Sequence, residues 1–313
     1  MRRARPAALL AFVAVPLTVV VAAAVLAACV PPNPPANCAP TGVTTQRNLR
    51  YASSPGTTAV MQSLDLYTPV RPAGCAATPV VVYVHGGGFR NGDKANQITD
   101  KVNLFTHEGW AFASVNYRLV GDARSGPTNG VYPAAEQDVA AAVNLLTRTA
   151  TANRIDPHKA MLLGHSAGAF LVSLESTDGS FLQTAGTPLT DVRCTASLDT
   201  TYDIPAQVAA GGDNALMYLL AFGTDPAVWA NGSPTHHVVA DTGIPSFHVV
   251  TRGLPDRTGQ AQAFGAQLRA AGVPADVQVA TGLSHEAVND AVGRAGDTVI
   301  TPPLMSFYRA CAR

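Results

Sequence analysis

The residues best suited to chemistry are 164–168, which read Gly-His-Ser-Ala-Gly and match the Gly-x-Ser-x-Gly spacing. This spacing exposes a serine hydroxyl on a sharp turn from a strand into a helix, and its glycines leave room for neighbouring main chain. The apolar run 159–163 predicts the strand, and residues 167–174 predict the start of the helix. Ser166 is therefore the candidate nucleophile.

A glycine run lies upstream, where His85 is followed by three glycines and Phe89. The apolar residues 79–84 before it predict a buried strand. Glycines that follow a strand leave main-chain N–H groups free to bind a substrate oxygen. Acyl transfer requires such donors because charge develops on the carbonyl oxygen, and losing one donor costs about 3 kcal/mol of transition-state stabilisation. A tight turn would explain either motif alone, but the ordered pair favours acyl transfer.

With both motifs in this order, the chain from about residue 63 to 308 resembles the α/β-hydrolases. It is most similar to bacterial esterases with an HGGG motif, including the hormone-sensitive-lipase-like and feruloyl-esterase-like groups. The resemblance implies a mostly parallel, twisted sheet with helices on both faces, and strands alternating with helical segments along the chain agree with it. It also implies that the N–H groups of Gly87, Gly88 and Ala167 form an oxyanion hole.

The family places its acid, and then its histidine, after the serine. Residues 245–251 predict a strand, and Asp256 follows it in a loop before a helix at about 258–271, where the family carries its acid. His285 follows the next predicted strand, in a loop that resembles the one with the family's histidine. We therefore expect Asp256 and His285 to complete the site. Six other residues are rivals for these roles. His165 fits a packing position, His85 resembles the histidine that orders the oxyanion loop, and His236 and His237 fit the protein surface. Asp199 and Asp203 follow a predicted strand that comes one strand too early for the family's usual acid.

The mechanism that follows is an acyl-enzyme route. His285 takes the proton of Ser166, Asp256 fixes the histidine tautomer, and water cleaves the acyl-enzyme. No metal or organic cofactor is expected, because the chain has no HExxH or CxxC spacing and no glycine fingerprint for a nucleotide. The favoured function is hydrolysis of a small or short-chain carboxylic ester. An amide hydrolase, formamidase-like or peptidase-like, and a non-catalytic binding lipoprotein on the same scaffold stay open as alternatives.

An insert at about 203–241 is expected to act as a short lid. Its apolar and aromatic side chains suit the walls of an acyl or aryl pocket, and packing into the core explains them equally well. The candidate substrate-binding residues are Phe89, Met217, Tyr218, Phe222 and Trp229.

The amino terminus resembles an export signal over residues 1–28, with three arginines before a long apolar run. Cys29 ends a Leu-Ala-Ala-Cys sequence that resembles a lipobox, and residues 29–43 form a proline-rich tether before a hydrolase domain at 44–313. We expect a lipoprotein held on the outer face of the cell membrane, or a secreted protein if the anchor is absent. The apolar run is also long enough to remain as an uncleaved membrane anchor.

Five cysteines are an odd number for an exported protein, and lipidation of Cys29 leaves four for pairing. Cys38 precedes the first predicted strand and Cys75 follows the second, so an antiparallel hairpin would bring them together. Cys194 begins a parallel strand, and Cys311 ends a C-terminal helix that runs toward the same end of the sheet. We predict the pairs Cys38–Cys75 and Cys194–Cys311.

Composition limits the partners. Lys and Arg number 21, as do Asp and Glu, so the net charge is zero and nothing favours nucleic acid. The expected partner is a small-molecule ester, and the sequence does not indicate an oligomeric state. A chain of 313 residues is long enough for one domain with a large core.

Overall fold

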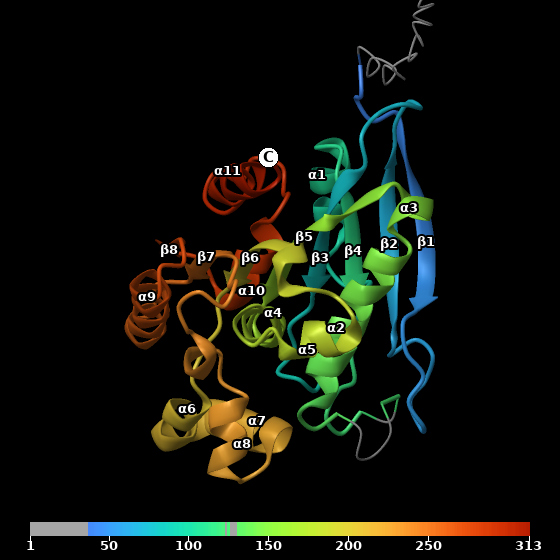
Figure 1. Cartoon of the computed structure of the whole chain (residues 1–313). Helices are drawn as coiled ribbons and strands as arrows, with labels where there is room; N and C mark the ends of the chain where they lie inside the picture. The colour runs from blue at the N-terminus through green and yellow to red at the C-terminus, as the bar shows by residue number, and fades with distance from the viewer. Residues whose placement is uncertain (1–36, 123, 126–129) are drawn as a thin grey trace, which may run out of the picture. The chain divides into compact units, whose positions relative to one another are not determined.

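A central β-sheet organises the protein (Figure 1). The computed structural model describes residues 37–313 except 123 and 126–129. In that part of the chain, eight strands pair in the order β1-β2-β4-β3-β5-β6-β7-β8. Their bounds are β1 Gly42–Arg50, β2 Ser63–Val70, β3 Thr78–Val84, β4 Ala111–Val115, β5 Ile155–His165, β6 Val192–Leu198, β7 Ser246–Thr251 and β8 Ala275–Val279.

The first two strands form an antiparallel hairpin, and β2 is also antiparallel to β4. All other neighbouring strands are parallel, from β4 and β3 across to β8. The prediction of a mostly parallel sheet is therefore confirmed. Parallel strands of one sheet point their carboxyl ends toward one edge, and the segments with candidate site residues leave the sheet there.

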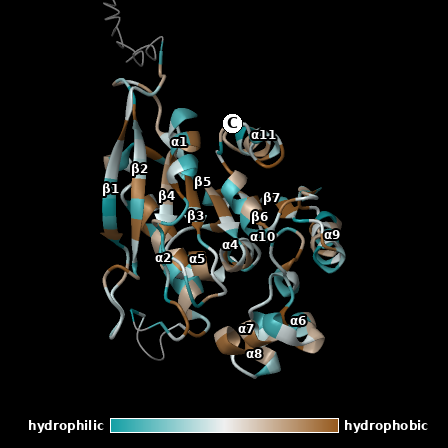
Figure 2. Ribbon diagram, turned by 180° about the vertical axis from the view of Figure 1, so that it is seen from behind, coloured by the Kyte–Doolittle hydropathy of each residue, from teal (hydrophilic) through white to brown (hydrophobic). Residues whose placement is uncertain are grey.

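Helices cover both faces of the sheet (Figure 1). One face carries α2 (Ala134–Arg148), α4 (Ala167–Thr177) and α9 (Pro255–Ala270), and the other carries α1 (Thr99–His107), α10 (His285–Ala291) and α11 (Thr301–Cys311). Apart from the insert between β6 and β7, short elements complete the described part of the chain: α3 (Ala150–Asn153), α5 (Ser180–Ala185) and the 3-10 turn η1 (Leu189–Asp191). The helix ribbons carry both hydrophilic and hydrophobic residues along their length, as expected when one side faces the sheet (Figure 2).

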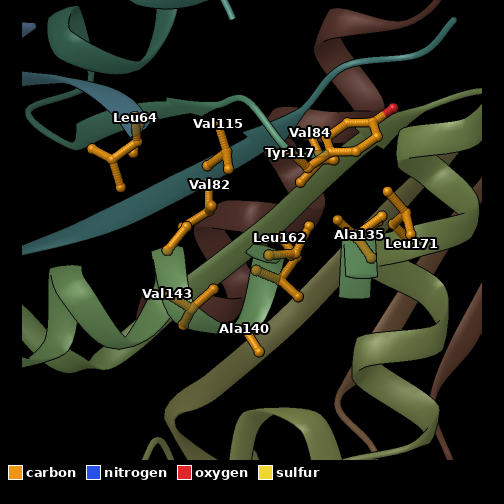
Figure 3. Close-up of a cluster of buried hydrophobic side chains, with 14 of the residues drawn as sticks. Leu64, Val82, Val84, Val115, Tyr117, Ala135, Ala140, Val143, Leu162 and Leu171 are labelled. Carbon is orange, nitrogen blue, oxygen red and sulfur yellow. The ribbon is translucent and has the colours of Figure 1, made fainter. Parts of the chain in front are cut away.

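Strand β3 shows why its apolar run is continuous. Val80, Val82 and Val84 point into the cluster beneath α2 and α4, where Figure 3 shows Val82 and Val84 beside Leu162 and Tyr117. Val81 and Tyr83 point to the opposite face, toward α1 and α11. Side chains alternate along a strand, so burial on both faces requires apolar residues at every position.

Between β6 and β7 the chain forms α6 (Ile204–Ala210), α7 (Gly212–Phe222), α8 (Pro226–Asn231) and the 3-10 turn η2 (Pro234–His237). Asp203 and Asp225 begin α6 and α8 by accepting hydrogen bonds from the N–H groups of Ala206 and Ala227. This insert occupies the segment expected to form a lid.

Both predicted disulfides are present. Cys38 and Cys75 lie 5.8 Å apart between Cα atoms, and Cys194 and Cys311 lie 6.2 Å apart. The first joins the two ends of the β1–β2 hairpin, and the second fastens the last turn of α11 to the start of β6. The strand geometry from which they were predicted is therefore confirmed.

The predicted export signal, the lipid site at Cys29 and most of the tether lie outside the described residues. Within the described residues, no helix is both long enough and apolar enough to cross a membrane.

Candidate active site

Ser166 lies on a strained turn between β5 and α4. Its φ of 55° and ψ of −122° fall outside the regions that a serine favours, and it remains partly exposed. A Cβ atom added at Gly168 would collide with the main chain of Val84 and His85. The glycine thus lets the end of β3 lie directly against the first turn of α4. This is the arrangement that the Gly-x-Ser-x-Gly spacing predicts.

The glycine loop after β3 lies beside this serine. A Cβ atom added at Gly86 would be 2.9 Å from the Cβ of Ser166. Gly87 and Gly88 have positive φ angles of 113° and 61°. Within the described residues, the carbonyls of Gly86 and Gly87 accept hydrogen bonds, whereas the N–H groups of Gly87, Gly88 and Ala167 donate none. These donors are therefore free to bind a substrate oxygen.

His285 begins α10 and forms a hydrogen bond with a buried carboxylate. Its Nδ1 lies 2.6 Å from Oδ2 of Asp199, whose side chain is 1% exposed. A carboxylate can only accept, so Nδ1 donates and carries the proton. Nε2 is consequently the nitrogen that can receive a proton from a nucleophile.

Asp199 follows β6 directly and is held on several sides. Its N–H donates to Val250 of β7, and its Oδ1 accepts a hydrogen bond from the N–H of Arg252. The Arg252 guanidinium lies 3.5 Å from Oδ2. Burial acts to raise the pKa of Asp199, but the hydrogen bonds and positive charges of His285 and Arg252 outweigh it and lower the pKa. The carboxylate therefore stays ionised beside the histidine.

The prediction that Asp256 partners His285 is wrong, because His285 donates to Asp199. Helix α9 begins at Pro255, so Asp256 lies on its exposed first turn and not in a loop. The sequence held a signal for this, since proline followed by an acidic residue is typical of the first turn of a helix. Asp199 follows β6, one strand before the position at which the family carries its acid, and no motif in the sequence marks Arg252.

His165 precedes Ser166 and is almost fully buried, at 3% exposure. Its Nε2 lies 2.9 Å from the main-chain oxygen of His285, and the two rings are 4.6 Å apart between centroids. The end of β5 and the start of α10 therefore meet at these rings. The contact also brings His285 next to the residue that precedes Ser166 in the chain.

The rival histidines His85, His236 and His237 serve local structure. His85 donates from Nδ1 to the carbonyl of Gly86 and stacks on Tyr117 at 4.6 Å. His236 lies 3.9 Å from Asp203, and His237 binds the carbonyl of Asn231 in the lid. No group of three or more His, Cys, Asp or Glu side chains in the described ranges could hold a metal ion.

The candidate substrate-binding residues fall into two sets. Phe89, Tyr218 and Phe222 are buried, and together with Phe170 they form an aromatic cluster with ring centroids 5.3 to 5.9 Å apart. Met217 lies over the glycine loop, with its Sδ 3.3 Å from the position of a Cβ atom at Gly88. Trp229 lies within the lid, where its indole N–H binds the carbonyl of Gly223.

A polar cleft of about 470 Å³ opens on the other side of the glycine loop. Its lining includes His85, Gly87, His165, Glu286 and Asn289. A cleft of larger volume, about 590 Å³, lies near α5, and none of these residues lines it.

The sheet order, the strained turn at Ser166 and the adjoining glycine loop define the architecture: the chain has the α/β-hydrolase fold. Residues 64–208 match the BD-FAE family model. The chain is 25% identical over 233 residues to an ethyl acetate hydrolase from Pseudomonas putida, covering 71% of this chain and 70% of that one.

Solved structures agree on the fold. Esterase B from Lactobacillus Rhamnosis superposes with a TM-score of 0.69 at 21% identity, covering 88% of this chain and 87% of the other. A bacterial heroin esterase superposes with a TM-score of 0.67 at 22% identity, covering 87% and 86%.

Proposed function

We propose that this protein is a serine carboxylic ester hydrolase with Ser166 as nucleophile, His285 as base and Asp199 as the acid that orients the base. The observation that carries the proposal is the convergence of these three residues at one edge of the sheet. Ser166 N–H donates to the carbonyl of Leu198, the residue immediately before Asp199, and Asp199 binds His285. The resemblance to esterases supports the same reaction.

The proposed mechanism follows from this geometry. His285 Nε2 accepts the proton of Ser166 Oγ as the oxygen attacks the acyl carbonyl, and the ionised Asp199 stabilises the imidazolium that forms. The N–H groups of Gly87, Gly88 and Ala167 bind the oxyanion. The imidazolium then protonates the departing alcohol, and His285 activates a water that cleaves the acyl-enzyme.

We propose a short acyl group as the substrate. Tyr218 and Phe222 of the insert pack against Phe89 and Phe170, and Met217 lies over Gly88 of the glycine loop, so these side chains limit the room for a long acyl chain. The relative described as an ethyl acetate hydrolase is consistent with a small acyl group.

A fluorophosphonate probe tests the nucleophile. It should label the wild-type protein once, at Ser166, and should not label Ser166→Ala. Hydrolysis of p-nitrophenyl acetate by Ser166→Ala should fall by at least about a thousandfold. Ser180→Ala, on the exposed end of α5, is the matched control and should keep full activity. A Ser166→Ala protein that still hydrolyses the ester above this limit contradicts the assignment, and anilide substrates test the amide alternative.

We also propose export and lipid anchoring at Cys29. Two disulfides within the hydrolase support an oxidising compartment, and the lipobox-like sequence supports the anchor. Mass spectrometry of the mature protein should find a diacylglyceryl group on Cys29. An unmodified terminus beyond residue 29 contradicts the anchor.

A further inference from the structure

The His165 side chain lies where three parts of the proposed active site meet. It directly precedes Ser166, and its Nε2 is bonded to the main-chain oxygen of His285 at 2.9 Å. A Cβ atom added at Gly86, the first glycine of the loop, would lie 3.0 Å from its Nδ1. One imidazole ring thus contacts the serine turn, the glycine loop and the histidine helix.

The chemistry of the bond fixes the state of the ring. A carbonyl oxygen can only accept, so Nε2 carries the hydrogen and donates it. Burial first, and then the nearby His285, lower the pKa of His165 to about 3, so the ring is neutral at pH 7. The donor is therefore always present, and the ring adds no charge beside the base.

Packing alone would not require this bond. His248 is equally buried, at 1% exposure, and lies on the central sheet, yet its Nδ1 bonds to the side chain of Asp276 and its ring lies against Phe307. His165 instead donates to the main chain of the very residue that must accept the serine proton. A shift of about 1 Å in such a group can cost a hundredfold in rate.

We propose that His165 is a positioning residue, which holds the backbone of His285 at the distance from Ser166 that proton transfer needs. The inference rests on the proposed function, because it assigns His165 a role only through His285 and Ser166. The helix that carries His285 begins at that residue, with Ser284 as its cap. The bond to His165 ties the first turn of this helix to the end of β5.

The experiment compares two nearly isosteric variants. His165→Gln places an amide N–H close to the position of Nε2, whereas His165→Met has a similar length and no donor. We expect His165→Met to lower kcat for p-nitrophenyl acetate by about 10- to 100-fold with KM changed less than threefold, and to slow fluorophosphonate labelling to the same extent. His165→Gln should recover activity to within about fivefold of wild type, and His248→Phe, the matched control, should retain it.

Equal activity of the Gln and Met variants, whether both are high or both are low, overturns the positioning role. A loss expressed in KM alone also overturns it. Ser166→Ala is assayed alongside: if it stays active, the proposed function itself fails, whereas an inactive Ser166→Ala with a fully active His165→Met refutes only the role of His165.

Discussion

Replacement of Asp199 by asparagine should remove most of the activity. Asp199 accepts three interactions in the structure: from His285 Nδ1 at 2.6 Å, from the N–H of Arg252 at 3.1 Å, and from the Arg252 guanidinium at 3.5 Å. Asparagine has the same shape and can still accept from Arg252. Its NH₂ group, however, would then face His285 and favour the tautomer with the proton on Nε2, which cannot accept the serine proton.

The expected size of the effect follows from that tautomer change. Loss of the correct tautomer in a serine triad lowers kcat by about 10⁴-fold, or about 5.5 kcal/mol of transition-state free energy. The free energy of unfolding should fall by less than this transition-state free energy, because the Arg252 side chain is 24% exposed and its guanidinium can turn to water. The assay is kcat for p-nitrophenyl acetate, with thermal unfolding measured on the same samples.

Asp256→Asn is the matched control, since Asp256 is exposed on the first turn of α9 and does not contact His285. It should keep activity within twofold of wild type. If Asp256→Asn loses as much activity as Asp199→Asn, or if Asp199→Asn keeps more than a tenth of wild-type kcat, the reasoning from the hydrogen bond is refuted.

Three further predictions concern stability and specificity. Burial raises the pKa of Glu136 from 4.5 to about 8, so the folded state binds the proton more tightly and the free energy of unfolding should fall as pH rises from about 4.5 to 8. Glu136→Gln should remove up to about 4 kcal/mol of that fall between urea titrations at pH 5 and pH 8, and equal pH slopes for the two proteins would contradict it. Cys311→Ser opens a loop of 117 residues and should lower the free energy of unfolding by about 5 kcal/mol in the chain-entropy model; an unchanged urea midpoint would oppose this. Met217→Ala should raise kcat/KM for p-nitrophenyl hexanoate relative to the acetate about tenfold, whereas Leu220→Ala, exposed on the same helix, should leave the ratio unchanged, and an unchanged ratio for Met217→Ala would count against the short-acyl proposal.

The sheet and the disulfides could be predicted because short-range patterns constrain them. The apolar run before His85 fits a strand buried on both faces, and the hairpin geometry brings Cys38 to Cys75. The sequence pattern does not show where α1 begins, at Thr99. Asp93 binds the N–H of Ala95, and Gln97 has a positive φ of 54°, so this stretch forms turns first.

The carboxylate that binds His285 could not be predicted in the same way. Parallel strands end at one edge of the sheet, so a carboxylate after β6 and one after β7 can both approach a histidine after β8. Choosing between Asp199 and Asp256 requires distances across strands, and motif spacing along the chain does not contain them. The sequence likewise does not predict whether the aromatic residues of the insert face the core or a pocket. Only the packing of Tyr218 and Phe222 on Phe170 shows which way they face.

The position of Asp199 also affects how this enzyme can be redesigned. The lid begins only a few residues after Asp199, and the connection is tightly bonded: Thr201 binds the hydroxyl of Tyr218 at 2.5 Å, and Tyr202 binds Ser197 at 2.9 Å. A lid transplanted from another esterase to change substrate range would therefore alter the support of the acid if the junction fell at the end of β6. Junctions placed after Tyr202 and before Ile244 would keep the bond between Tyr202 and Ser197, but the new segment would have to supply a hydroxyl in place of Tyr218 to bind Thr201. The exchangeable cassette is therefore shorter than the loop between β6 and β7.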